Sequence, residues 1–453
     1  MSEGSRENKM GVWPVNKLLI SMSVPIMISM VVQALYNVVD SIYISYLSES
    51  ALTAVSLSFP VQQLMIALNV GTGVGVNSFL SRSLGEKNYK NVNACANHGL
   101  ILASISTVIF MIVGFTCVRP FFLSQTADAE IIYHGEQYLG IVCIFSFGIF
   151  HAVMLERLLV ATGRTIYHMI TQLAGALTNI ILDPIMIFGL LGCPKMGAAG
   201  AAAATVIGQF VAFFLALFFN LTRNSDVKLG FKGFRLDFTI LKKIYQVGFP
   251  SILMQSLGSV MTYCLNLILI GFTSTAAAVL GIYFKLQSFV FMPVFGLNNG
   301  MVPIVAFNYG AKQKARILKA IRLAITYAEI LMLLGTGLFI LLTPQLLGLF
   351  DASPQMLALG IPALRIIATH FLLAGITIVF MSVFQALGNG KYSLITSLTR
   401  QIVVLLPVAW LFSMSGDVQK VWWAFPIAEG VAVLLSLLFY RRLYRLRINE
   451  IPG

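Results

Sequence analysis

Apolar runs of about 20 residues recur along the whole chain, and short polar stretches separate them. A run of this length lets a helix cross the hydrocarbon core of a bilayer, whereas strands of a membrane barrel alternate polar and apolar residues over about ten positions. The pattern predicts an all-α polytopic membrane protein with about twelve transmembrane helices. The expected spans are 18–46, 52–81, 93–117, 131–157, 165–190, 197–220, 241–270, 276–306, 317–342, 356–386, 392–413 and 419–440.

Composition agrees with this pattern. Of the 453 residues, 58% are apolar and 10% are charged, whereas about 25% of the residues of soluble domains are charged. The net charge of +13 does not indicate nucleic-acid binding, because the basic residues concentrate in the two tails and in alternate loops. By the positive-inside rule these segments and both termini are predicted to be cytoplasmic, so the number of spans is even. The basic segments are 6–17, 82–90, 164, 223–243, 312–322, 391 and 441–447.

An internal repeat divides the chain, because residues of the first half recur 225 positions later, as Pro25 does at Pro250. An even number of spans in each half gives the halves the same orientation, related by an axis along the membrane normal, with a substrate site between them. The other matched pairs are Gly71/Gly296, Gly75/Gly300, Gly85/Gly310, Lys87/Lys312, Gly135/Gly360, Gly163/Gly388 and Tyr167/Tyr392. The predicted parts are a cytoplasmic segment 1–17, a six-helix lobe 18–220, a cytoplasmic linker 221–240, a second six-helix lobe 241–440 and a basic cytoplasmic tail 441–453.

One aspartate lies inside an apolar run, at Asn179-Ile-Ile-Leu-Asp183-Pro184. An acid at the centre of a membrane helix costs about 2.5–3.5 kcal/mol. Asn179 and Asp183 share one helix face, and Pro184 removes a backbone donor, so we expect a kink that frees carbonyl groups. Carbonyls beside a carboxylate would hold a proton or a small cation. An aspartate hydrated by the headgroup region explains this stretch equally well.

A polar face follows the first span at helical spacing. In a membrane helix such a face is expected to look into the protein or a water-filled cavity. Helix–helix hydrogen bonding explains the neutral residues as well, but it suits a carboxylate poorly. Asp40 and Asp183 lie at similar distances from the outer ends of their spans, and Thr205 lies near that level, so these residues and Asn179 are predicted to meet. The polar face consists of Ser29, Gln33, Tyr36, Asn37 and Asp40.

A third acid, Glu156, falls near the cytoplasmic end of the fourth span, beside Arg157. An ion pair at the membrane interface is the favoured explanation from these residues alone. The second half has different chemistry, because Asp40, Glu156 and Asp183 correspond to Leu265, Met381 and Val408. Its intramembrane acids are Glu329 and Glu429. We therefore expect the first half to handle ions.

Motifs for other chemistry are absent from the sequence. The five cysteines are scattered, and the histidines (His98, His134, His151, His168 and His370) show neither HExxH nor another paired metal spacing. Gly71-Thr-Gly73-Val-Gly75 is not followed by Gly-Lys-Ser/Thr, so it predicts close helix packing rather than a phosphate loop. We expect no enzyme, no metal site and no cofactor apart from a coupling ion.

The sequence resembles the multidrug and toxic compound extrusion (MATE) family, near its MepA-like branch. The resemblance covers nearly the whole chain, and its motifs are specific in combination. They are Tyr36-Asn37-Val38-Val39-Asp40, Asn179 to Gly189, Gly197 to Thr205, Arg82-Ser-Leu-Gly85 with its counterpart Asn308-Tyr-Gly310, and Leu155-Glu156 before Ala161-Thr-Gly163.

The resemblance implies two six-helix lobes in a V and a multidrug efflux antiporter that exports organic cations in exchange for H⁺ or Na⁺. It implies a cation site at Asp40, Asn179, Asp183 and Thr205, with Tyr36 beside it. Glu156 is expected to contact drug, as are Asp183 and the cavity-facing Gln33 and Tyr36. Many family members carry acids where this chain has Gln255 and His370, so the second lobe departs from the pattern. We expect a monomer in the cell membrane that confers antibiotic resistance and does not bind nucleic acid.

The alternative function is that of a flippase for lipid-linked precursors, a function that similar two-lobed proteins have. That function would favour a basic cavity, whereas this chain has few intramembrane cations, namely Arg157, Lys285, Arg365 and Arg400. An integral-membrane enzyme is a third possibility, which the histidine spacing disfavours.

Overall fold

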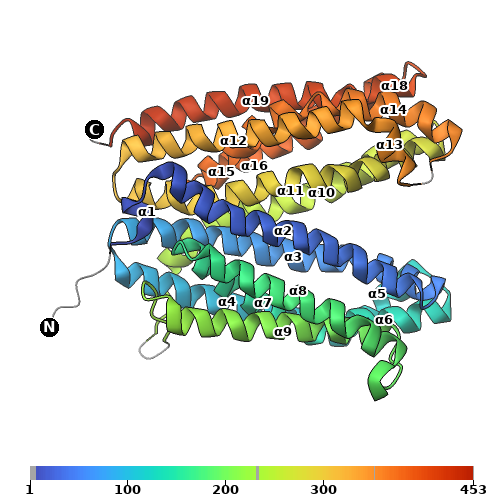
Figure 1. The fold of residues 1–453 in the computed structure, drawn as a ribbon, viewed down its shortest axis with the longest axis horizontal. Coiled ribbons are helices and arrows are strands. Elements are labelled where there is room, and N and C mark those ends of the chain that lie inside the picture. The colour runs from blue at the N-terminus through green and yellow to red at the C-terminus, as the bar shows by residue number, and fades with distance from the viewer. Residues whose placement is uncertain (1–6, 231–233, 351, 452–453) are drawn as a thin grey trace. The chain divides into compact units, whose positions relative to one another are not determined.

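The computed structural model describes residues 7–230, 234–350 and 352–451, apart from the side chains of Asn37, Ser41 and Ser45. Throughout these ranges the chain forms helices and loops and contains no strand (Figure 1). The ends of the predicted terminal segments, at 1–6 and 452–453, and Lys232 of the predicted linker lie outside the described residues.

The helices repeat along the two halves of the sequence. α3 and α11 have bounds 225 residues apart, as do α4 and α12, and Lys87 and Lys312 each adopt a φ of 56° after the first of these helices. The first half comprises α1 (Lys9–Val12), α2 (Val15–Ser45), α3 (Glu49–Gly85), α4 (Tyr89–Thr116), α5 (Val118–Gln125), α6 (Ala129–Ile144), α7 (Phe147–Ala161), α8 (Thr165–Phe188), the 3₁₀ turn η1 (Leu190–Gly192) and α9 (Ala198–Arg223). The second half comprises α10 (Phe238–Ile270), α11 (Ser274–Gly310), α12 (Lys314–Leu341), α13 (Thr343–Gly348), α14 (Pro354–Ala368), α15 (Phe371–Ala386), α16 (Gly390–Leu398), the π-helical η2 (Thr399–Leu405), α17 (Leu406–Ser413), α18 (Val418–Val421), α19 (Ala424–Leu443) and the π-helical η3 (Tyr444–Ile448).

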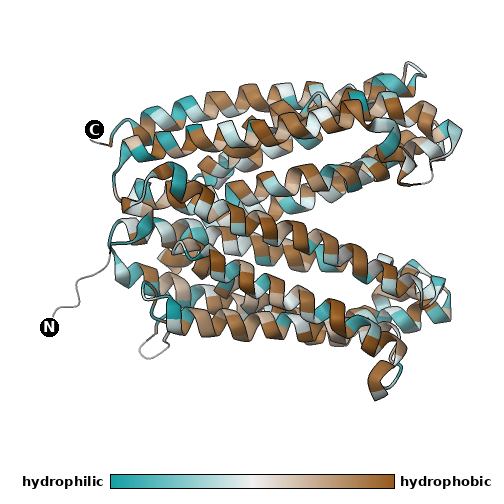
Figure 2. Cartoon of the chain, viewed as in Figure 1, coloured by the Kyte–Doolittle hydropathy of each residue, from teal (hydrophilic) through white to brown (hydrophobic). Residues whose placement is uncertain are grey.

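The predicted fold class, with about twelve membrane-spanning helices, is confirmed. Among the described residues, ten helices are long and apolar enough to cross a bilayer, and the count reaches 12 if each of two bent pairs is one span. Figure 2 shows apolar residues along the helices and hydrophilic residues gathered toward helix ends. The protein is therefore an all-α polytopic membrane protein.

Two of the predicted spans are bent pairs of helices rather than single continuous helices. Span 131–157 is bent by 45° between α6 and α7, and span 356–386 is bent by 47° between α14 and α15. Neither break contains a proline, and the apolar pattern continues across both. Hydropathy could therefore not reveal them.

Contacts between helices divide the chain into two units, Ile28–Gly248 and Met1–Met27 with Phe249–Gly453. The division cuts α2 and α10 close to the repeat-related Pro25 and Pro250. The start of each half's first long helix thus packs within the unit built mainly from the other half. The lobes expected at 18–220 and 241–440 follow the repeat rather than these contacts, and their boundaries stay a prediction.

Glycines permit the close packing of these exchanged helix segments. In the unit Ile28–Gly248, a Cβ on Gly75 would lie 2.2 Å from the carbonyl oxygen of Ile244. In the other unit, a Cβ on Gly300 would lie 2.5 Å from Ser23 Oγ, and Ser23 Oγ donates a hydrogen bond to Leu297 O at 3.1 Å. The repeated glycines are therefore sites of close backbone approach, as membrane helix interfaces favour.

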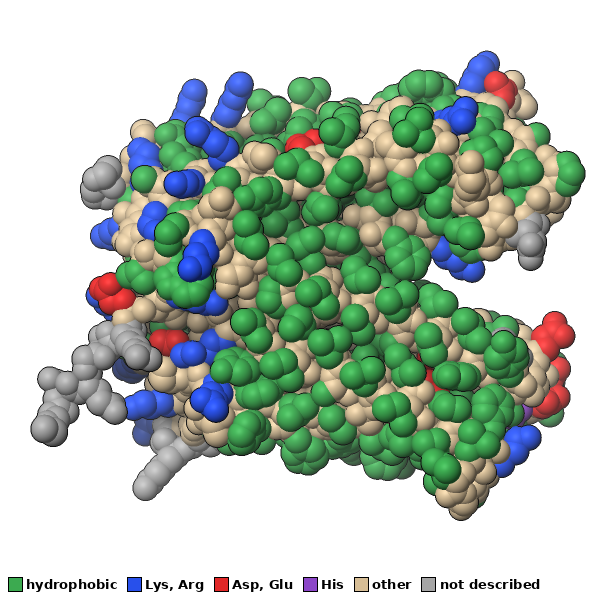
Figure 3. Space-filling model, viewed as in Figure 1, with side chains coloured by type: hydrophobic (Ala, Val, Ile, Leu, Met, Phe, Trp, Pro, Cys, Tyr) green, Lys and Arg blue, Asp and Glu red, His purple; other side chains and the backbone are tan. Residues whose placement is uncertain are grey.

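The described part of the linker docks against α4 within the unit Ile28–Gly248. Asn97 Nδ2 donates to Gly230 O at 2.8 Å, and His98 Nε2 accepts from the backbone N–H of Asp237 at 2.8 Å. The backbone N–H of Thr239 donates to the Asp237 carboxylate, and this bond holds the pKa of Asp237 below its usual value. Figure 3 shows basic side chains gathered at the ends of the helices where this linker runs.

Candidate ion and substrate site

The predicted cation-site residues of α8 and α9 are linked by one amide. Asn179 Nδ2 donates to Asp183 Oδ1 at 3.3 Å and to Thr205 Oγ1 at 3.2 Å. Asp183 is fully buried, and Asn179 is 3% exposed. The two helices approach closely because Gly208 packs on the backbone of Gly175, where a Cβ on Gly208 would lie 2.7 Å from the carbonyl oxygen. Small residues thus bring the Thr205 hydroxyl within reach of Asn179.

Asp40 of α2 completes this group. The carboxyl groups of Asp40 and Asp183 lie within hydrogen-bonding range of each other. An ionised carboxylate only accepts hydrogen bonds, so two carboxylates in contact need a proton or a cation between them. Among the described residues, Asp40 Oδ1, Asp183 Oδ2 and Asn179 Oδ1 are buried without a hydrogen-bond partner. These oxygens can therefore bind a proton or a hard monovalent cation.

No group of three or more His, Cys, Asp or Glu side chains that could hold a metal ion occurs within the described ranges. The group around Asp183 offers two carboxylates, an amide and a hydroxyl. Such oxygen ligands suit hard cations, while sites for transition metals usually contain imidazole or thiolate.

Two tyrosines flank the carboxylates. Tyr36 of α2 was predicted beside the cation site, and both it and Tyr138 of α6 lie within electrostatic range of Asp40 and Asp183. The Tyr138 hydroxyl accepts a hydrogen bond from Gln62 Nε2 of α3 at 3.1 Å. Sequence reasoning missed Tyr138 and Gln62, because neutral polar residues in α3 and α6 did not stand out.

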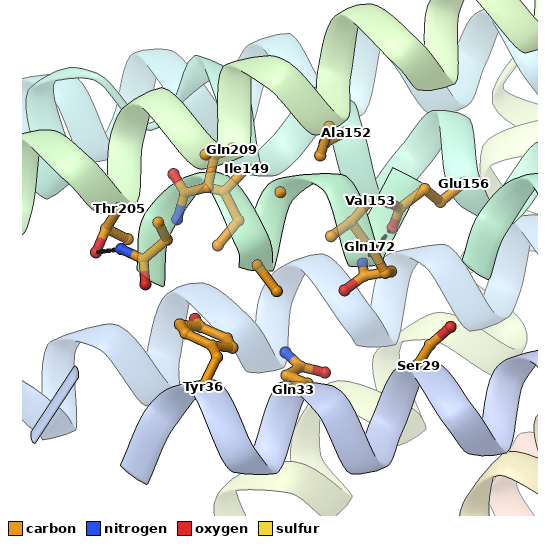
Figure 4. Close-up of a pocket in the computed structure, with 15 residues that line it drawn as sticks. Ser29, Gln33, Tyr36, Ile149, Ala152, Val153, Glu156, Gln172, Thr205 and Gln209 are labelled. Carbon is orange, nitrogen blue, oxygen red and sulfur yellow. Dashed lines mark hydrogen bonds between the residues drawn. The ribbon is translucent and has the colours of Figure 1, made fainter. Parts of the chain in front are cut away.

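A cavity lies within the unit Ile28–Gly248. In Figure 4, Ser29, Gln33 and Tyr36 project from α2 toward residues of α7, α8 and α9 on the opposite wall. Three residues of the polar face predicted on the first span, Ser29, Gln33 and Tyr36, thus line a cavity, while the Asn37 side chain lies outside the described residues. The lining comprises Ser29, Gln33, Tyr36, Ile149, Ala152, Val153, Glu156, Gln172, Gly175, Ala176, Asn179, Thr205, Gly208, Gln209 and Ala212.

Glu156 of α7 lines this cavity and is only 2% exposed. It accepts hydrogen bonds from Thr171 Oγ1 at 2.8 Å and Gln172 Nε2 at 2.6 Å, and His168 Nδ1 lies 3.6 Å from its Oε2. Arg157 lies within electrostatic range of Glu156. Three neighbours from α8 therefore hold a carboxylate that the sequence left as a candidate for an interfacial ion pair.

The two acidic positions lie at different levels of α8. Gln172 binds Glu156, and Asn179 binds Asp183. The 11 residues from Gln172 to Asp183 span about 16 Å of helix at ~1.5 Å per residue. Asp40 and Asp183 are not among the lining residues, but Tyr36, Asn179 and Thr205 are. Asp40, Asn179, Asp183, Thr205 and Tyr36 thus form one group, while Gln33 and Glu156 line the cavity beyond it.

The chain is similar to known transport proteins over almost its whole length. A family model described as MatE matches residues 25–185 and 250–411. A relative named multidrug export protein MepA, from Staphylococcus saprophyticus, is 30% identical over 429 residues, which are 94% of this chain and 93% of that protein. The MepA of Staphylococcus haemolyticus is 27% identical and covers 96% of this chain and 95% of its own length.

Solved structures of transporters show the same similarity. One is described as an outward-facing conformation of a multidrug resistance MATE family transporter of the MOP superfamily; it has a TM-score of 0.91, 28% identity and 99% coverage of both chains. Another is a MOP superfamily transporter from Pyrococcus furiosus, for which a reverse polarity of the binding pocket is said to suggest a different function. It has a TM-score of 0.90, 28% identity and 99% coverage of both chains.

Proposed function

Because the chain belongs to the MatE family of multidrug efflux transporters, we propose that it is a secondary active antiporter that exports organic cations in exchange for H⁺ or Na⁺. Alternating access moves the two species in opposite directions. The observation that carries this proposal is the direct contact between the buried carboxyl groups of Asp40 and Asp183 beside a cavity that Glu156 lines. The chain works as a monomer in the cell membrane, with both termini in the cytoplasm.

The coupling ion binds between Asp40 and Asp183. Two ionised carboxylates in contact repel each other, and a proton or Na⁺ between them removes the repulsion. Asn179 and Thr205 supply further oxygens around Asp183. The bound ion therefore ties α2 to α8.

The organic cation occupies the cavity. Among the described lining residues, Glu156 alone carries a charge, and Tyr36 contributes an aromatic ring. A carboxylate attracts a positive group, and an aromatic face binds cations by about 0.5–2 kcal/mol. Drugs of different shape are accommodated because the remaining walls are apolar or neutral polar.

Coupling follows from the position of α2. This helix carries Asp40 in the ion site and Gln33 and Tyr36 in the cavity wall. An ion bound between Asp40 and Asp183 fixes the position of α2 and therefore moves Gln33 and Tyr36 relative to the drug. Ion binding thus weakens drug binding, although the two ligands contact different residues. A membrane potential of 100 mV adds about 2.3 kcal/mol per charge moved inward.

The flippase alternative fits the cavity poorly. A lipid-linked precursor carries phosphate groups, which basic side chains would bind. The described lining contains one acid and no Lys or Arg. This polarity favours a cationic substrate.

The test uses purified protein in liposomes with pH and sodium gradients imposed separately. Asp183→Asn is expected to abolish ion-driven accumulation of a fluorescent organic cation, and Asp40→Asn to reduce it strongly. Glu49→Gln, at an exposed acid in the first turn of α3, serves as the control and retains transport. Wild-type uptake by Asp183→Asn would refute the proposed coupling.

A further inference from the structure

In the second half, two side chains of opposite charge lie where the first half has part of its cavity border. The repeat spacing of 225 residues aligns Gly175 of α8 with Arg400. In the order of helices, α19, which carries Glu429, corresponds to α9, which carries Thr205. Gly175 and Thr205 both line the cavity. Arg400 therefore occupies a position equivalent to one that lines the cavity, and Glu429 lies on the helix equivalent to the one that carries Thr205.

The two side chains form an ion pair inside the unit that contains Phe249–Gly453. Arg400 Nη1 donates to Glu429 Oε2 at 3.2 Å, from the π-helical η2 to α19. Glu429 is 3% exposed. A π-helical segment changes which residues face a neighbouring helix, and such segments recur at functional sites. Here the residue that faces α19 is an arginine instead of a glycine.

The ion pair leaves oxygen atoms unsatisfied. Within the described part of the chain, Glu429 Oε1 and the fully buried Tyr283 hydroxyl have no hydrogen-bond partner. Tyr283 of α11 lies within electrostatic range of both Glu429 and Arg400. Thr396 Oγ1 and Ser436 Oγ are also buried without a partner. Thr396 shares a helix face with Arg400, and Ser436 shares one with Glu429.

We propose that Glu429 and Tyr283 belong to a sodium-type cation site of the second half whose occupant is the guanidinium group of Arg400. A buried carboxylate needs a positive partner, and in a membrane protein an unpaired one is costly. Asp40 and Asp183 have no such tethered partner in the described structure and must take a free ion. Arg400 supplies a partner that cannot dissociate, so the site at Glu429 takes no free ion in the transport cycle.

This inference rests in part on the proposed antiport, because it states which half exchanges ions. Its binding component is independent of transport. When Arg400 is shortened to a neutral side chain, Glu429 loses its counter-charge and gains space beside it. A free Na⁺ then takes the place of the guanidinium group.

The decisive measurement is equilibrium binding of radioactive Na⁺ to purified full-length protein in detergent, at alkaline pH to suppress proton competition. Arg400→Gln is expected to show a saturable Na⁺ site that the wild type lacks. Arg400→Gln combined with Glu429→Gln is expected to lose that added site again. Equal Na⁺ binding by folded wild-type and Arg400→Gln proteins would overturn the proposal.

A second measurement covers the case in which Arg400→Gln does not fold. The double variant Arg400→Gln/Glu429→Gln removes both charges and leaves no buried ion unpaired. It is expected to transport drug with the wild-type ratio of ions to substrate, measured from reversal potentials in liposomes. A changed ratio would place the pair inside the ion cycle and overturn the proposal. If instead Asp183→Asn transports normally while Arg400→Gln gains a Na⁺ site, the proposed antiport fails and the latent site stands.

Discussion

The side-chain amide of Asn179 donates a hydrogen bond to Thr205 Oγ1 at 3.2 Å and thereby ties α8 to α9. The same amide group donates to Asp183 Oδ1 at 3.3 Å. One neutral residue thus fixes the position of a buried carboxylate relative to the neighbouring helix. This arrangement makes Asn179 a positioning residue for Asp183, in addition to the ion-binding role proposed for it.

Asn179→Ala is expected to weaken ion binding about 10- to 100-fold, because a hydrogen bond to a charged group contributes about 1.5–3 kcal/mol. The concentration of Na⁺ or H⁺ that gives half-maximal drug uptake measures this effect. Thr178→Val is the matched control, since among the described residues the Thr178 hydroxyl donates only to Ala174 O of its own helix. Unaltered ion dependence in Asn179→Ala would exclude Asn179 from the ion site.

Glu156→Gln is expected to separate drug binding from ion binding. Loss of the only charge in the described cavity lining should raise KM for a cationic drug about tenfold, equivalent to about 1.4 kcal/mol. The half-saturating ion concentration should stay unchanged, because Glu156 contacts α8 far from Asp183. Uptake of a cationic and an isosteric neutral dye in the same liposomes measures the difference. Equal losses for both dyes would show that Glu156 acts through structure rather than charge.

Gly75→Ala is expected to destabilise the protein by about 1–3 kcal/mol, the usual range for overpacking. Its Cβ would meet the carbonyl oxygen of Ile244 at 2.2 Å, and a backbone atom cannot move aside cheaply. Gly140→Ala is the matched control, because nothing lies within 4 Å of the added Cβ. Alanine there should be neutral or stabilising, given its higher helix propensity. Thermal unfolding in detergent compares the two, and equal melting temperatures would contradict the close-contact interpretation.

The sequence revealed those features whose placement in a membrane has a high free-energy cost. Apolar runs marked the spans, and carboxylates within them marked Asp40 and Asp183, because burial of an acid needs a reason. The repeat was visible because glycine and proline tolerate few substitutions where backbones approach or bend. In each case the signal was a residue type whose placement is energetically or sterically restricted.

The sequence did not reveal features that involve neutral polar residues or the choice of packing partners, because neither carries a large free-energy penalty in a membrane. Tyr138, Gln62 and Thr171 are neutral polar residues that resemble many others in the chain. Only packing brings Tyr138 near Asp40, Gln62 to the Tyr138 hydroxyl and Thr171 to Glu156. The bends at 145–146 and 369–370 interrupt neither the apolar pattern nor its length. The exchange of helix segments at Met27 and Gly248 depends on which helix packs on which, and periodicity carries no information about partners.

Asn97→Ala is expected to release the described part of the linker from α4. Asn97 both donates to Gly230 O at 2.8 Å and accepts from Gly230 N at 3.3 Å, and Asn93 accepts from the backbone N–H of Lys228. Loss of the paired amide bonds leaves backbone groups that water must satisfy, so the linker should open more often and expose its basic residues. Limited trypsin digestion should therefore cleave the variant after Lys228 several-fold faster than the wild type. Asn91→Ala, on the same helix, is the control, and equal cleavage rates for both variants would mean that Asn97 does not hold the linker.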